Sequence, residues 1–240
     1  MDFSGPLKDF PFLLQGLYTT LVVSAASIVI AGILGLGVAV LRLSRFRALR
    51  TVGAFYVVVI QSTPFFALLL WIYFVLPAAI GLKRPDVFMF GIAALVITYA
   101  PFYGETYRSG ILAVPSGQRE AALSTGMTER QAFRRVVLPQ AFRNTLPPLT
   151  SLCVSAVKDS AVIGPVLGVQ EIIWHASIIQ GTTFRPAETF ILAALLYVAI
   201  TFPLTLVGNY LHRRSQGLAT PSMLTAGFWR LGRADTSPAP

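Results

Sequence analysis

Long apolar stretches dominate the chain, and short polar or basic segments separate them. A helix needs about 20 mostly apolar residues to cross a bilayer. Five stretches reach this length, so the pattern predicts membrane-spanning helices over residues 17–41, 52–80, 87–107, 146–169 and 189–211. The predicted fold class is all-α, a polytopic membrane helix bundle with five transmembrane helices.

The composition supports a membrane protein over a soluble one. Hydrophobic residues make up 55% of the chain and charged residues only 12%, whereas soluble domains carry about 25% charged residues. The net charge of +9 would also suit a nucleic-acid partner, but the cations lie beside apolar spans, as in the cytoplasmic loops of membrane proteins. We therefore expect contact with membrane lipid and no nucleic-acid binding.

The distribution of Lys and Arg predicts the orientation. Basic residues cluster after the first span, between the third and fourth spans, and after the fifth. Because such clusters mark the cytoplasmic side, the N-terminus is expected outside and the C-terminus in the cytoplasm. Residues 1–214 are predicted to form the transmembrane domain, and residues 215–240 a poorly ordered cytoplasmic tail.

The cytoplasmic segment over residues 115–145 is amphipathic rather than apolar. Ser116 is expected to cap a first short helix, and Gly126 to break it. Thr128 then begins a capping-box spacing for a second helix over residues 129–137. Pro139 is expected to end that helix. The segment is thus predicted to form a two-helix knob that enters a groove on a soluble partner; the alternative is an ordinary loop that covers the inner mouth of the bundle.

The spacing within this segment matches a known signature. Glu120-Ala121-Ala122 is followed after three residues by Gly126 and, after nine more, by Val136 and then Leu138-Pro139. This resembles the EAA signature of the permease subunits of ABC importers. Flanking stretches resemble the polar amino-acid uptake family (histidine, glutamine and glutamate permeases), and the resemblance covers roughly residues 12 to 213. One departure is Gln61, where that family usually has an arginine.

The resemblance implies a fold like that of type I ABC importer permeases, with a cytoplasmic two-helix coupling segment. It implies a multi-pass subunit of the bacterial inner membrane that translocates a polar amino acid and is not itself an enzyme. The implied partners are a second permease subunit of the same or a homologous chain, an ABC ATPase dimer that carries ATP and Mg, and an extracytoplasmic solute-binding protein. The residues implied in ATPase coupling are Glu120, Ala121, Ala122, Gly126, Leu138 and Pro139. The sequence contains no Gly-x-x-x-x-Gly-Lys-Ser/Thr loop to bind nucleotide phosphates, which agrees with ATP binding on a separate ATPase subunit.

Ionisable residues within spans are costly and are functional candidates by default. The candidates for a substrate path are Glu105, Arg108, Lys158 and Asp159, with Thr63 and Ser160 as neutral hydrogen-bonding groups. The charged candidates suit a zwitterion, but ion pairs that only hold the spans together are an alternative; Glu105 and Arg108, three residues apart, lie on one helix face. No catalytic residue or metal ligand is expected, because the single cysteine and two histidines lack metal-site spacing.

Two other functions remain open. An ion-coupled secondary amino-acid transporter or channel subunit would also explain charges inside the spans, but not the capped two-helix segment. An intramembrane enzyme would need a paired-carboxylate, His-cluster or nucleophile motif, and none stands in the spans. The sequence does not identify the amino acid.

Overall fold

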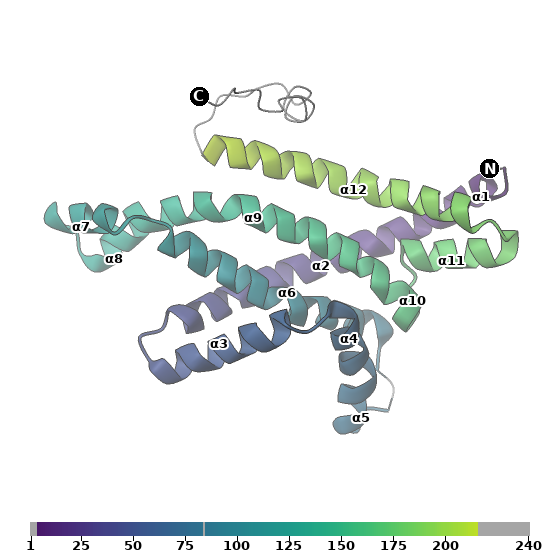
Figure 1. Ribbon diagram of the computed structural model, residues 1–240, viewed down its shortest axis with the longest axis horizontal. Coiled ribbons are helices and arrows are strands. Elements are labelled where there is room, and N and C mark those ends of the chain that lie inside the picture. Colours follow the sequence, from purple (N-terminus) through teal and green to yellow (C-terminus); the bar gives the residue numbers. More distant parts are fainter. Residues whose placement is uncertain (1–3, 84, 216–240) are drawn as a thin grey trace, which may run out of the picture.

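The computed structural model describes residues 4–83 and 85–215 of the chain. Over these residues the regular elements are all helices, which confirms the predicted fold class (Figure 1). Residues 216–240, which make up nearly all of the predicted tail, lie outside the described residues.

Fifteen helical elements follow one another along the described chain. They are α1 (Ser4–Lys8), α2 (Phe10–Leu43), α3 (Arg47–Gln61), α4 (Phe65–Leu70), η1 (Trp71–Val75), α5 (Leu76–Ala79), α6 (Val87–Leu112), α7 (Ser116–Ser124), α8 (Glu129–Ala132), η2 (Phe133–Val137), α9 (Leu138–Asp159), η3 (Ser160–Val162), α10 (Ile163–Leu167), α11 (Ile172–Thr183) and α12 (Pro186–Ser215). The elements η1 and η2 are π-helical turns and η3 is a 3₁₀ turn.

Among the described residues, four helices are long and apolar enough to cross a membrane, and a bent pair supplies a fifth crossing if it counts as one span. The predicted second span, 52–80, is not one straight helix. It divides into α3 and the α4–η1–α5 segment, which meet at 105°. The break falls at Pro64, whose extended ψ of 135° interrupts the helix and whose nitrogen has no hydrogen to donate.

The helix after the coupling segment also differs from the prediction. Pro139 does not end it, because α8, η2, α9, η3 and α10 follow one another without a break as one long helix, Glu129–Leu167. The π-helical turn explains this result, since Leu138 N–H donates to Phe133 O in the i→i+5 pattern. This widened turn brings Pro139 into the first turn of α9, where its missing donor does little harm.

Two buried clusters form the interior. The larger draws on α2, α4, η1, α6, α9 and α10 and includes Leu69, Leu95 and Ile163; the smaller joins the start of α2 to α11 and α12. Glycines bring α2 and α6 together: a Cβ on Gly35 would lie 2.5 Å from Tyr103 Cβ, and one on Gly104 would lie 2.6 Å from Val38 Cβ. Small residues allow such close approach in membrane bundles.

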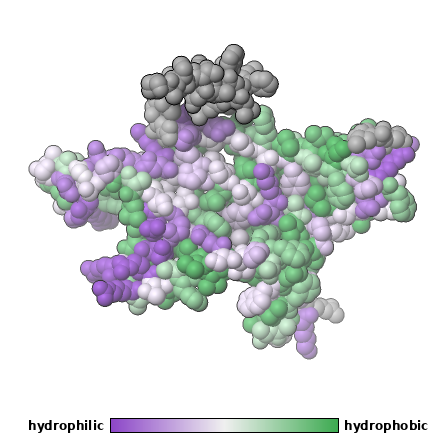
Figure 2. Space-filling model, viewed as in Figure 1, coloured by the Kyte–Doolittle hydropathy of each residue, from purple (hydrophilic) through white to green (hydrophobic). Residues whose placement is uncertain are grey.

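The bundle is elongated (Figure 1). The α7–α8 pair lies at one end, and α1 and α11 lie at the other (Figure 1). Hydrophilic residues gather at the α7–α8 end and around the α2–α3 connection, while hydrophobic residues cover much of the remaining length (Figure 2). The candidate coupling surface is therefore spatially separate from the apolar body.

Candidate functional site

The coupling segment consists of α7 and α8 joined by a tight turn at Gly126. The turn is a Schellman motif, in which Met127 N–H donates to Ala122 O at 3.3 Å and Gly126 N–H donates to Leu123 O at 3.0 Å. Gly126 has a φ of +84°, a left-handed conformation that glycine adopts without a Cβ penalty. The predicted pair of helices joined at this glycine is confirmed.

The two helices begin differently. At α8 the predicted capping box is confirmed, since Gln131 N–H donates to Thr128 Oγ1 at 3.3 Å and Thr128 N–H donates to Gln131 Oε1 at 2.9 Å. At α7 the predicted cap is wrong, because Ser116 is already the first helical residue and Pro115 precedes it with no side-chain cap. The extended backbone of Pro115, with ψ at 136°, sets the start of the helix instead.

An ion pair holds α7 against α8. Arg119 Nε donates to Glu129 Oε2 at 3.0 Å, and the second guanidinium nitrogen contacts the other carboxylate oxygen. Both side chains remain more than half exposed, so the pair orients the helices more than it stabilises them. The turn, the capping box and this bidentate pair together give the segment a defined shape.

The six predicted coupling residues divide by exposure. Glu120, Ala121, Gly126, Leu138 and Pro139 are exposed, whereas Ala122 is only 6% exposed. Ala122 therefore packs inside the segment and shapes it, while the other five are accessible at the α7–α8 end of the bundle.

The charged pair within the third span belongs to a larger cluster. Glu105 accepts from Arg108 Nε at 2.8 Å, as the spacing predicted, and also from Arg42 Nε at 2.6 Å. Arg42 lies on α2, so the cluster ties α2 to α6 near the end where α7 and α8 lie. About a fifth to a quarter of each side chain is exposed. These three groups satisfy one another, which favours a structural role over substrate contact.

The candidates at the end of α9 are not brought into one site. Asp159 accepts from Tyr99 O–H at 2.8 Å, and buried Ser160 donates to Val157 O at 2.7 Å. Lys158 is exposed, and no ion pair recorded for the described residues includes it. Thr63 in the break after α3 donates to Val59 O at 2.8 Å. Lys158 is thus the charged candidate with its side chain available.

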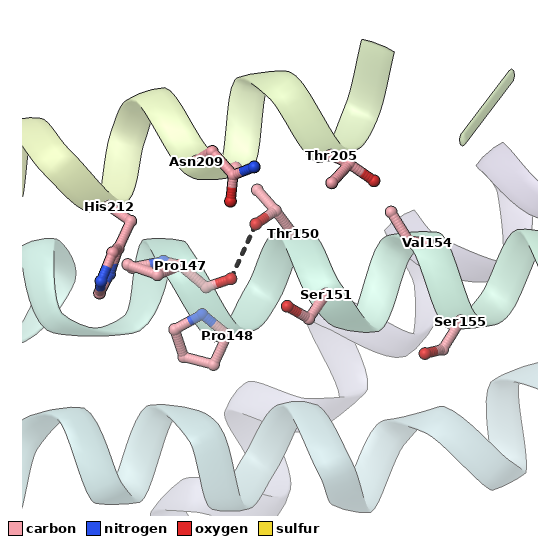
Figure 3. A pocket seen from close by; sticks show the side chains of 10 residues that line it. Pro147, Pro148, Thr150, Ser151, Val154, Ser155, Thr205, Asn209 and His212 are labelled. Atoms are coloured by element: carbon pink, nitrogen blue, oxygen red, sulfur yellow. Dashed lines mark hydrogen bonds between the residues drawn. The ribbon is translucent and has the colours of Figure 1, made fainter. Parts of the chain in front are cut away.

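A polar groove between α9 and α12 escaped the sequence analysis. It has a volume of about 500 Å³, and Figure 3 shows the side chains that line it. The lining residues are Pro147, Pro148, Thr150, Ser151, Val154, Ser155, Thr205, Gly208, Asn209 and His212. The signal that could have found it is the i, i+4 spacing of Ser151 with Ser155 and of Thr205 with Asn209.

A buried carboxylate at the opposite end also escaped the sequence analysis. Glu171, between α10 and α11, is 1% exposed and accepts from Trp174 N–H at 2.7 Å, Ile173 N–H at 2.8 Å and Tyr197 O–H at 2.7 Å. Gly164 provides the space, because a Cβ there would collide with Glu171 Oε1. Burial raises the pKa of Glu171 to about 7, despite these hydrogen bonds. The carboxylate caps α11 and joins it to α12.

Over the residues that the structure describes, no group of three or more His, Cys, Asp or Glu side chains is placed to hold a metal ion. The candidate functional features of the described chain are the coupling segment, the exposed side chain of Lys158 and the polar groove.

Comparisons with known proteins agree with this geometry. Residues 12–217 match the family model described as "binding-protein-dependent transport system inner membrane component". The chain is 36% identical to the probable glutamine ABC transporter permease protein GlnM of Bacillus subtilis, over 89% of this chain and 98% of the relative. It is 32% identical to the glutamate/aspartate import permease protein GltK of Escherichia coli, over 89% and 98% of the two chains.

A solved structure shares the fold. The chain superposes on a crystal structure of an amino acid ABC transporter with histidines with a TM-score of 0.83 and 34% sequence identity. The match covers 89% of this chain and 99% of the other.

Proposed function

The chain belongs to the family of binding-protein-dependent transport system inner membrane components, and we propose that it is the membrane-spanning subunit of an ATP-driven importer for a polar amino acid. The observation that carries this proposal is the α7–α8 pair, a defined and exposed two-helix surface at one end of a membrane bundle. Relatives named for glutamine, arginine, and glutamate/aspartate support a polar amino acid as substrate.

The partners follow from the division of labour in such an importer. An ABC ATPase dimer supplies ATP hydrolysis with Mg and contacts the coupling segment from the cytoplasm. A second permease subunit, identical or homologous, completes the passage, and a solute-binding protein delivers the amino acid from outside. The orientation that fits these partners places the N-terminus outside and the C-terminus in the cytoplasm, in keeping with the basic loops beside α2 and α12.

Within the coupling segment, Glu120, Ala121, Gly126, Leu138 and Pro139 provide the contact surface for the ATPase, since all are exposed. Ala122 provides the close packing that fixes their arrangement. Glu120 offers a carboxylate to a basic group of the ATPase, and the small side chain of Ala121 lets the partner approach the helix backbone closely.

In the spans, Lys158 is the candidate for contact with the substrate carboxylate, because its ammonium group is available while Asp159 is hydrogen-bonded to Tyr99. Glu105 and Arg108 keep the bundle together through Arg42. Family membership argues against an ion-coupled secondary transporter or channel. The coupling segment argues against it as well, because that alternative assigns the segment no role.

The proposal is tested by Gly126→Asp in vesicles that hold the permease, its ATPase and its binding protein. Asp tolerates a left-handed backbone, and no atom lies within 4 Å of a Cβ at this position, so the variant is expected to insert and fold. The added carboxylate should prevent productive docking, so that ATP hydrolysis continues without uptake.

Gly126→Asn is the matched control, because it adds similar bulk and tolerates the same backbone conformation without a charge. It is expected to retain more uptake than Gly126→Asp. Normal uptake by the Asp variant would refute the assignment of this surface to coupling.

A further inference from the structure

The groove between α9 and α12 is formed by two polar stripes. On α9, Ser151, Ser155 and Lys158 follow the i, i+4, i+7 spacing of one helix face. On α12, Thr205, Asn209 and His212 follow the same spacing. Except for Lys158, one turn beyond Ser155, these residues line the groove, and Asn209 and His212 reach from α12 toward α9 in Figure 3.

These stripes lie on helices that are long and apolar enough to cross a membrane. Ser151 and Ser155 fall inside the apolar helix Glu129–Leu167, and Thr205 and Asn209 inside the apolar helix Pro186–Arg214. Hydroxyl and amide groups that face hydrocarbon without a partner cost free energy, so polar faces of membrane helices turn toward protein or a water-filled cavity. Because Ser151, Ser155, Thr205 and Asn209 are exposed in the single chain, the groove is expected to hold water or a polar solute rather than lipid.

The shape of the groove is fixed on one side. Gly208 allows α12 to approach α9 so closely that a Cβ at this position would collide with Thr150 Oγ1. Thr150 in turn donates to Pro147 O at 2.7 Å, so its hydroxyl is already bonded within α9. The helices therefore diverge from a close contact, and a volume of about 500 Å³ is within the range of small-molecule sites.

The chemistry of the lining suits a zwitterion in transit. No Asp, Glu, Lys or Arg lines the groove, and hydroxyl and amide groups both donate and accept hydrogen bonds. Such groups serve a carboxylate and an ammonium equally well, without the strong hold of a fixed countercharge.

We propose that this groove is a transfer site for the amino acid, in which Ser151, Ser155, Thr205 and Asn209 hydrogen-bond the substrate backbone groups after Lys158 has received the carboxylate. This inference rests on the proposed function and adds to it the place where the substrate passes. A substrate that depends on these contacts is bound weakly enough to leave, as passage requires.

The test uses thiol accessibility in the complete transporter. Cys153 is the only cysteine of the chain, so Cys153→Ser gives a background into which Ser155→Cys or Asn209→Cys is introduced. Val207→Cys is the matched control, because residues two apart on a helix point in nearly opposite directions. A charged, membrane-impermeant methanethiosulfonate is added to vesicles open on both sides. The groove thiols are expected to react severalfold faster than the control thiol.

A mixture of glutamine, arginine and glutamate, added during ATP turnover, is expected to slow modification of the groove thiols, while a neutral sugar is not. Groove thiols as unreactive as the control, or reactive but unprotected, would overturn the inference. The first result would point to a second subunit packed on the groove. If the background transporter still imports with ATP, either result leaves the proposed function intact; absence of ATP-dependent uptake by the unmodified complex would instead refute the proposed function.

A second measurement keeps Cys153 in place. Asn209→Leu removes the amide at similar size and is expected to raise the KM for uptake by about tenfold or more, since a hydrogen bond to a charged group is lost. Val207→Leu should leave KM unchanged. An unaltered KM for Asn209→Leu would contradict a substrate contact at this position.

Discussion

Glu105→Gln is expected to destabilise the protein markedly without altering a substrate contact. The carboxylate accepts from Arg42 Nε at 2.6 Å and from Arg108 Nε at 2.8 Å, so two guanidinium groups share one negative charge. The substitution keeps the shape of the side chain but leaves both cations without a counterion in a partly buried cluster.

The size of the effect follows from the burial. Breaking a fully buried ion pair by removing one partner costs about 3–5 kcal/mol. The three side chains here are 20–27% exposed, so water compensates in part, and the amide oxygen of Gln still accepts one hydrogen bond. We therefore expect a loss of about 2–4 kcal/mol in the free energy of unfolding.

Thermal unfolding of the purified permease in nanodiscs measures this loss, and uptake kinetics measure any change in KM. Glu129→Gln is the matched control, because Glu129 also pairs with an arginine but is 64% exposed; an exposed pair is worth at most about 1 kcal/mol. Equal stability of the two variants would refute the argument from burial. An increased KM for Glu105→Gln with unchanged stability would instead assign Glu105 to the substrate path.

Three further predictions concern the packing of the bundle at Gly110 and the buried carboxylate of Glu171. Gly110→Leu should prevent stable folding, because a Cβ at this position would collide with Thr145 Cγ2 and lie 3.0 Å from Ala141 O; size-exclusion chromatography of the purified complex checks this outcome. Glu171→Ala should lower the unfolding free energy by about 2–5 kcal/mol, because Tyr197 O–H and two backbone N–H groups lose their acceptor, whereas Glu171→Gln should lose less; thermal unfolding distinguishes them. Because burial raises the pKa of Glu171 from 4.5 to about 7, the folded state binds more protons between these values, so the unfolding free energy should fall as pH rises through this interval and level off above it. Glu171→Gln should lack this pH dependence of the unfolding free energy when unfolding is measured across the same interval. An identical pH dependence in both proteins would contradict its assignment to Glu171.

Much of the fold could be predicted because span number depends on the length of apolar runs, which the sequence states directly. The two-helix coupling segment was also readable, since the capping box at Thr128 and the turn at Gly126 are local signals. The break at Pro64 and the continuity through Pro139 were not, because similar prolines act differently according to their backbone context. A π-helical turn lets the helix continue through Pro139, whereas the extended backbone of Pro64 interrupts the helix.

The candidate site was readable only in part, for a related reason. Whether a charge inside a span is available depends on partners far away in the sequence, such as Arg42 for Glu105 or Tyr99 for Asp159. The polar groove requires the faces of α9 and α12 to meet, and single-helix spacing does not determine which helices are neighbours. The helix α11 and Glu171 were missed because the carboxylate acquires its role from Gly164 and Tyr197, on other elements.

The unbroken helix Glu129–Leu167 has a mechanical consequence. At 1.5 Å per residue it is about 58 Å long, with α8 of the coupling segment at one tip and Ser151 and Ser155 beyond its middle. A tilt of about 10° around its centre would move each tip by about 5 Å. Force applied to α8 therefore reaches a wall of the groove within a single piece of secondary structure, and the π-helical turn at Phe133–Val137 is the place where that transmission would yield first.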